Sequence, residues 1–184
     1  RTAAASHSVL RISSARHNVF FLYAKGHHIH PGTTTLRVGY GAGRRRRWTM
    51  QQVIIYTDGG ARNNPGPAGI GVVIIDGEKK VELKKYIGER TNNWAEYEAV
   101  ILALTEAKKR GLGGRDIEIR MDSELIQRQL TNEYQVKEET LWPQYIKVHN
   151  LLVAHFPHIT FVHIPRAKNA EADRLVNEAI DEAR

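Results

Sequence analysis

The order of the expected strands and helices constrains the fold more than any other feature of this sequence. Apolar runs bounded by turn signals predict three strands in succession, whereas two further strands each follow a helical segment. The predicted strands cover residues 53–56, 70–75, 81–88, 116–121 and 159–164, and the predicted helices cover residues 93–110, 123–130, 141–155 and 169–183. Strands joined through helices run parallel with right-handed crossovers. We therefore expect an α/β fold with a mixed five-stranded sheet (three antiparallel, then parallel strands) and helices on both faces.

Four acidic residues occupy positions that this fold would bring together. The first strand is expected to end in a turn over residues 57–60 that contains Asp58, and Asp122 follows the fourth strand directly. Glu96 lies in the first turn of the long helix, and Asp173 lies in the first turns of the last helix. If the first and fourth strands are adjacent and parallel, both aspartates lie at the carboxyl edge of the sheet, where open α/β sheets bind ligands.

Converging carboxylates repel one another and raise each other's pKa unless cations lie between them. Ligand sets made only of oxygen favour Mg²⁺ or Mn²⁺ over zinc, and such a cluster can hold two ions. Each acidic residue alone could instead be a helix cap or a loop-end residue. The four positions together favour a metal-dependent site.

The basic excess of the chain lies entirely in its first 49 residues. Nine of the 27 Lys and Arg residues lie there and none of the 20 Asp and Glu residues, so the rest is slightly acidic, with 18 basic residues against 20. Net charge therefore does not indicate a nucleic-acid binder. We expect residues 1–49 to be a disordered basic extension and residues 50–184 to be the folded domain. The extension could be a transit peptide, a basic arm that binds nucleic acid, or sequence from upstream translation or cloning. We favour the last of these three interpretations.

The absence of cysteine excludes disulfides and thiolate metal sites and is compatible with a reducing compartment. No apolar run approaches the roughly 20 residues that a membrane-spanning helix needs. We therefore expect a cytoplasmic monomer without a membrane partner.

Four motifs in the chain resemble, in order and in spacing, the signatures of type 1 ribonucleases H. They are residues 57–69 (TDGGARNNPGPAG), 91–96 (TNNWAE), 121–123 (MDS) and 169–175 (NAEADRL). The resemblance spans residues 52–182. It implies a ribonuclease H-like endonuclease that binds an RNA–DNA hybrid and cuts its RNA strand, leaving a 5′-phosphate and a 3′-hydroxyl. It assigns catalysis and the binding of two Mg²⁺ ions, for which Mn²⁺ can substitute, to four residues: Asp58, Glu96, Asp122 and Asp173.

The resemblance also implies contacts with the substrate. Asn64, Asn92 and Asn93 match positions that touch the minor groove of the hybrid, and Thr91 matches a position that touches a DNA-strand phosphate. Short amides suit the recognition of a 2′-hydroxyl because they both donate and accept hydrogen bonds. Asn64 could instead serve its turn, and Asn92 could cap the helix. Gly59, where the backbone could approach the substrate closely, and Ser123, which could cap a helix, are further candidates.

The sequence departs from many family members near the last helix. The flexible loop that often carries a proton-shuttling His is short here and has none. His163 has the family's spacing from Asp173, but it is expected inside the last strand on the same face as Phe161. Arg166 could contact a phosphate but could not shuttle protons, because it stays charged.

Two further differences from many family members concern substrate binding. The basic handle after the fourth strand is missing, and Glu124 stands where many relatives have Gln. The chain therefore resembles the compact branch of the family found in archaea and many bacteria. Three alternatives stay open: a related polynucleotidyl transferase, a nuclease with another substrate preference, and a hybrid-binding module. The Asn-Pro-Gly loop and the Thr-Asn-Asn motif argue against the first, and the complete carboxylate set argues against the third.

Overall fold

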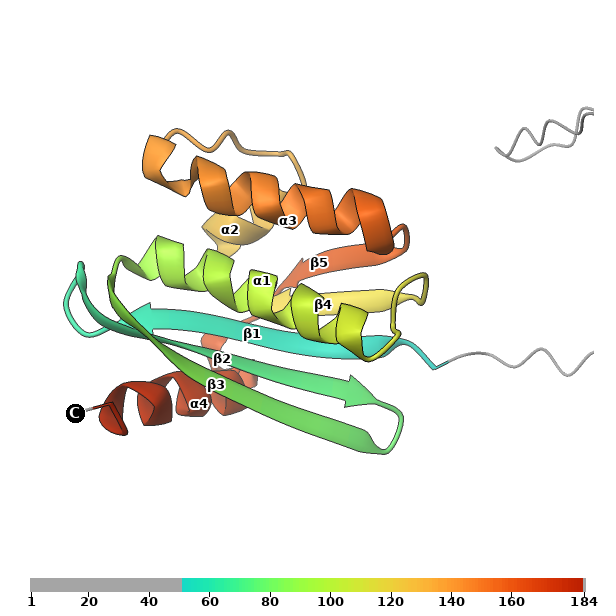
Figure 1. Ribbon diagram of the computed structural model, residues 1–184, viewed down its shortest axis with the longest axis horizontal. Helices are drawn as coiled ribbons and strands as arrows, with labels where there is room; N and C mark the ends of the chain where they lie inside the picture. The colour runs from blue at the N-terminus through green and yellow to red at the C-terminus, as the bar shows by residue number, and fades with distance from the viewer. Residues whose placement is uncertain (1–50, 184) are drawn as a thin grey trace, which may run out of the picture. The chain divides into compact units, whose positions relative to one another are not determined.

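The computed structural model describes residues 51–183, and the predicted extension over residues 1–49 lies outside the described residues. The described residues form five strands, four α-helices and two short 3₁₀ helices (Figure 1). The strands are β1 (Val53–Ala61), β2 (Gly66–Asp76), β3 (Lys79–Arg90), β4 (Ile117–Met121) and β5 (Ile159–His163). The α-helices are α1 (Asn92–Lys109), α2 (Glu124–Leu130), α3 (Trp142–His155) and α4 (Ala170–Asp181), and the 3₁₀ helices are Glu139–Leu141 and Arg166–Lys168.

The strands form one sheet in the order β3-β2-β1-β4-β5. β2 pairs antiparallel with both β1 and β3, while β4 pairs parallel with both β1 and β5. Helices α1, α2 and α3 lie on one side of the sheet and α4 lies on the other (Figure 1). The predicted fold class, including the mixed sheet with helices on both faces, is confirmed.

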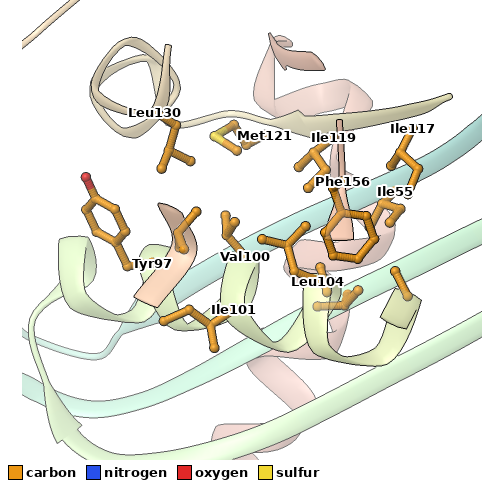
Figure 2. Close-up of a cluster of buried hydrophobic side chains, with 14 of the residues drawn as sticks. Ile55, Tyr97, Val100, Ile101, Leu104, Ile117, Ile119, Met121, Leu130 and Phe156 are labelled. Atoms are coloured by element: carbon orange, nitrogen blue, oxygen red, sulfur yellow. The ribbon is translucent and has the colours of Figure 1, made fainter. Parts of the chain in front are cut away.

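The main hydrophobic core lies between the sheet and α1 (Figure 2). Alternating residues of β1 and β4, among them Ile55 and Ile119, point their side chains toward Leu104 of α1 and Phe156, which follows α3. Burying one such side chain contributes roughly 1.5–3 kcal/mol to stability. The long helix and the two strands are thereby fixed against each other, and these three elements carry or precede Asp58, Glu96 and Asp122.

Glycines in β2 let α4 lie directly on the other face of the sheet. A Cβ atom at Gly71 would lie 2.3 Å from the carbonyl oxygen of Ala172, and one at Gly69 would lie 2.8 Å from that of Val176. Such distances are shorter than any side chain permits, so the helix backbone takes the space that a side chain would need. This packing fixes the height above the sheet of Asp173, the neighbour of Ala172.

The first strand differs from its predicted end. β1 continues through the TDGG motif to Ala61, so Asp58 lies inside the strand and not in a turn. The two glycines after Asp58 pair with β2, and a Cβ at Gly59 would lie 2.2 Å from the backbone carbon of Ala95. Gly59 therefore serves the close packing of α1 on the strand, Gly60 faces Val176 of α4, and neither glycine breaks the strand. Within residues 51–183, no helix is long and apolar enough to cross a membrane.

Candidate active site

Three of the four predicted carboxylates lie together at one edge of the sheet. Asp58, Glu96 and Asp122 each offer a carboxylate oxygen, and these atoms all lie within 4.8 Å of one another. The pairing of β1 with β4 ends at Tyr56 and Arg120, two positions before each aspartate. β4 itself ends at Met121, so Asp122 directly follows the strand beside which Asp58 lies.

Glu96 reaches this edge because α1 begins directly above β1. Thr91 caps the helix, its hydroxyl oxygen accepting a hydrogen bond from the backbone nitrogen of Trp94 at 3.3 Å. The missing side chain at Gly59 allows the first turn of the helix to rest on the strand backbone. The expectation that Asn92 could cap this helix is wrong, because Thr91 occupies the cap position and Asn92 is the first helical residue.

Two of the three carboxylates, those of Asp58 and Glu96, have raised pKa values. Burial, together with the charges of Asp122 and Asp173, raises the pKa of Asp58 from 3.8 to about 7. Burial and the charges of Asp58 and Asp122 likewise raise the pKa of Glu96 well above its ordinary value. A backbone hydrogen bond from Gly59 and the charge of Arg166 oppose both shifts without cancelling them. An oxygen-only donor set with this excess of negative charge fits a hard divalent cation such as Mg²⁺ or Mn²⁺.

Asp173 lies beside this group but not within it. One of its carboxylate oxygens accepts a hydrogen bond from the Arg166 guanidinium, and the other accepts one from the Asn177 amide at 3.1 Å. Its charge still raises the pKa of Asp58, so it belongs to the same electrostatic neighbourhood. The four predicted residues therefore form a group of three with a neighbouring fourth that already has a cationic partner.

Asn169 is a site residue to which the sequence analysis gave no role. Its side chain is buried, and its amide nitrogen donates to Oδ1 of Asp122 and to the backbone oxygen of Thr57, both at 3.0 Å. It therefore connects the start of α4 with β1 and with the end of β4. The only signal in the sequence was its place at the head of the fourth motif.

The predicted substrate residues form a polar network between the β1–β2 connection and the start of α1. Asn64 accepts a hydrogen bond from the backbone nitrogen of Asn92 at 3.0 Å, and Asn92 accepts one from that of Ala61 at 2.8 Å. Both amides use their oxygen atoms, and among residues 51–183 neither amide nitrogen donates to a protein group. Asn93 lines a cavity of about 530 Å³ that also has Tyr134 in its wall.

The remaining candidates have separate positions. Ser123 caps α2, and its hydroxyl oxygen accepts a hydrogen bond from the backbone nitrogen of Ile126 at 3.4 Å. His163 is exposed at the end of β5, opposite Met121, so its predicted place inside a strand is confirmed. Within the described residues it forms no hydrogen bond with the carboxylates. Arg166 lies in the 3₁₀ helix before α4 and contacts Asp173.

Comparisons with known proteins agree with this geometry. Residues 56–179 match the family model described as reverse transcriptase-like. Ribonuclease HI of Halobacterium salinarum is 41% identical over 134 residues, which cover 72% of this chain and 66% of that protein. Ribonuclease H of Clostridium botulinum is 35% identical over 153 residues, covering 72% of this chain and 98% of that protein.

A solved structure is also similar. LC11-RNase H1, crystallised in complex with an RNA/DNA hybrid, is 56% identical with a TM-score of 0.69, and the match covers 71% of this chain and 98% of that one. The match to a bifunctional protein of Mycobacterium tuberculosis, 40% identical over 135 residues, spans only 36% of that protein's length. The chain therefore corresponds to about a third of that longer relative.

Proposed function

The chain belongs to the ribonuclease H family, and on that premise we propose that it is a metal-dependent endonuclease that hydrolyses the RNA strand of RNA–DNA hybrids. The observation that carries the proposal is the group formed by Asp58, Glu96 and Asp122, whose carboxylate oxygens lie within 4.8 Å of one another. A similar protein with 56% identity has been crystallised with an RNA/DNA hybrid, which supports the substrate class.

The proposed metal ligands are these three carboxylates together with Asp173, and the ions are Mg²⁺, with Mn²⁺ able to substitute. Two bound ions would supply an activated water and neutralise the charge on the leaving 3′ oxygen, so that the products carry a 5′-phosphate and a 3′-hydroxyl. The protein holds the ligands in place through Asn169, which fixes the Asp122 carboxylate against β1. Gly59 contributes by allowing α1, and with it Glu96, to approach Asp58.

Recognition of RNA is assigned to the amides near the start of α1. The oxygen atoms of Asn64 and Asn92 hold the β1–β2 connection against the helix, which leaves their amide nitrogens as donors for the minor groove of the hybrid. Asn93 extends this surface toward the cavity beside α2. Thr91 accepts the capping hydrogen bond and keeps its hydroxyl proton for a phosphate oxygen of the DNA strand.

Arg166 is proposed to bind a phosphate near the scissile position. Its side chain is 78% exposed and pairs with Asp173 beside the carboxylate group, where a phosphate must be held despite the surrounding negative charge. It stays charged at every working pH and therefore cannot transfer a proton. His163, at the end of β5, is retained as a weaker candidate for that task because Met121, its partner in the strand pairing, directly precedes Asp122.

The test is a cleavage assay with the full chain, Mg²⁺ and a hybrid labelled on its RNA strand. We expect cleavage of that strand only, and loss of at least a hundredfold in rate for Asp122→Asn with the fold retained. DNA duplex and RNA duplex of the same sequence are the controls. Binding of the hybrid without cleavage would indicate a binding module, and cleavage of the RNA duplex would indicate a nuclease with another substrate preference. Joining of DNA ends would indicate a polynucleotidyl transferase. Each of these outcomes contradicts the proposal.

We also propose that residues 50–184 form the catalytic domain, acting as a cytoplasmic monomer, and that residues 1–49 are not needed for cleavage. Residues 51–183, which the structure describes, supply a hydrophobic core and the candidate site. Equal cleavage rates for the full chain and for residues 50–184, each eluting at monomer mass with light scattering, would support this. A tenfold loss on truncation would assign the first 49 residues a role in holding the hybrid.

A further inference from the structure

We propose that Arg166 keeps Asp173 from binding metal in the substrate-free protein, and that a substrate phosphate releases Asp173 by taking over the guanidinium. Arg166 is in this sense a positioning residue for a metal ligand, in addition to its proposed contact with phosphate. The inference rests on the proposed function, because it assigns an order of events to the same site.

The contacts of Asp173 carry the first step. Both of its carboxylate oxygens are engaged, one by Arg166 and the other by Asn177, whereas Asp58, Glu96 and Asp122 turn oxygen atoms toward a common point. A metal ion that binds Asp173 with the other three residues would place a second positive charge beside the guanidinium of Arg166. Arg166 and a cation therefore compete electrostatically for the Asp173 carboxylate.

The side chains of Arg166 and Asp173 differ in exposure, which indicates which of the two moves. Arg166 is 78% exposed, whereas the Asp173 side chain is 28% exposed and lies on a helix held against the glycines of β2. The backbone on both sides of Arg166 is anchored, by the hydrogen bond from Ile164 to the backbone oxygen of Met121 before it and by the buried side chain of Asn169 after it. The guanidinium can therefore swing on its long side chain while the carboxylate and the backbone stay in place.

The alternative partner for Arg166 is a phosphate, whose oxygen atoms can accept hydrogen bonds from a guanidinium as those of a carboxylate do. A guanidinium forms bidentate, charge-assisted hydrogen bonds with phosphate as readily as with a carboxylate. An ion pair this exposed contributes little in water, so a phosphate held at the site can replace the carboxylate at small cost. Because linkage is reciprocal, a substrate that removes Arg166 from Asp173 raises the affinity for metal, and metal raises the affinity for substrate by the same factor.

The test is a calorimetric titration of Mn²⁺ into the full chain without nucleic acid, for the wild type, Arg166→Ala, Asp173→Asn and the double variant. We expect Arg166→Ala to bind Mn²⁺ about threefold more tightly, or to take up one more ion, as fits the loss of one exposed ion pair. The gain should vanish in the Asp173→Asn background. Lys168→Ala, which removes the same charge from the same 3₁₀ helix, is the matched control, and Arg166→Gln is the second variant should Arg166→Ala be unstable.

Two results would overturn the inference. Equal gains for Arg166→Ala and Lys168→Ala would show a general charge effect, and a gain that persists in the Asp173→Asn background would show that Arg166 does not act through Asp173. Neither measurement depends on cleavage, so a failed hybrid assay and a failed titration are distinguishable. A second measurement tests the exchange of Asp173 for phosphate. The Mn²⁺ concentration that gives half-maximal cleavage should fall for the wild type as the hybrid concentration rises, and it should stay constant for Arg166→Gln. An equal fall in both proteins contradicts the exchange.

Discussion

The buried amide of Asn169 donates a hydrogen bond of 3.0 Å to the carboxylate of Asp122. The same nitrogen donates to the backbone oxygen of Thr57, also at 3.0 Å, so one side chain joins α4, β1 and the end of β4. A hydrogen bond to a charged, partly buried acceptor is worth more than one between neutral groups. The position of the Asp122 carboxylate therefore depends on a residue that would not itself bind metal.

Replacing Asn169 with Ala should weaken Mn²⁺ binding about tenfold and lower the free energy of unfolding by about 1–3 kcal/mol, because Asp122 and a buried carbonyl lose their donor. Asn169→Asp should lower the free energy of unfolding of the metal-free protein further, since it removes the donor and adds a negative charge beside Asp122. Calorimetry with Mn²⁺ and chemical denaturation measure the two effects. Asn150→Ala, an exposed site on α3, is the control. Unchanged metal binding in Asn169→Ala would contradict a positioning role.

The stability of the metal-free protein should depend on pH in a direction set by Asp58. Its pKa is about 7 in the folded protein and near 3.8 in the unfolded chain, so the folded state binds the extra proton between these values. The contribution of Asp58 to the free energy of unfolding should therefore be largest below about pH 4 and should decrease as the pH rises to about 7. Glu96 shifts in the same direction.

Thermal unfolding in EDTA at several values between pH 5 and pH 8 tests this dependence. Asp58→Asn should unfold at a higher temperature than the wild type at pH 8 and should show a shallower fall with pH, because the repulsion is gone. Added Mg²⁺ should restore stability to the wild type at pH 8 and much less to Asp58→Asn. A wild-type protein that becomes more stable from pH 5 to pH 7 in EDTA would contradict the raised pKa.

Gly71→Ala should move α4 away from the sheet. Its Cβ would lie 2.3 Å from the carbonyl oxygen of Ala172, a backbone atom that cannot rotate aside. We expect a loss of about 1–3 kcal/mol in the free energy of unfolding, together with a lower cleavage rate because Asp173 is displaced with the helix. Gly60→Ala, whose Cβ would meet only a methyl group of Val176 at 3.3 Å, is the milder control. Equal stability of the two variants would argue against close helix packing as the role of Gly71.

Asn64→Asp separates the two roles proposed for this amide. The change keeps the oxygen that accepts from the backbone of Asn92 but removes the NH₂ donors offered to the hybrid. We expect a roughly tenfold rise in KM with little change in kcat or in the unfolding temperature. Asn63→Asp adds the same charge one residue earlier and controls for repulsion of phosphates. Equal rises in KM for both variants would assign the effect to charge rather than to the lost donor.

The sequence predicted the element order and the sheet correctly because hydrophobic periodicity and turn signals are local properties. It misplaced the end of β1, because Asp-Gly-Gly is typical of a turn when read alone. Only the packing of Ala95 against Gly59 shows that these glycines serve a close approach inside a strand. The cap at Thr91 was likewise open to confusion with Asn92, since both residue types cap helices.

The carboxylate positions could be predicted because strand ends and helix starts converge at one sheet edge in this topology. The pairing of Arg166 with Asp173 could not, since it depends on the course of a short 3₁₀ helix for which the sequence has no periodic signal. The role of Asn169 was hidden for a different reason. An Asn at the head of a helix is typical of a cap, yet here its side chain turns inward to Asp122.

The carboxylates of the site come from positions 58, 96, 122 and 173, spread across nearly the whole described chain. Each carboxylate lies on or directly after a different element, namely β1, α1, β4 and α4, so no partly folded form that lacks one of these elements can present the complete set. Ions that bind only the native state pull the folding equilibrium toward it, so metal binding by all four carboxylates reports on the assembled domain. It follows that a nascent chain presents the complete set only after the last helix has docked, so full catalysis must wait for α4.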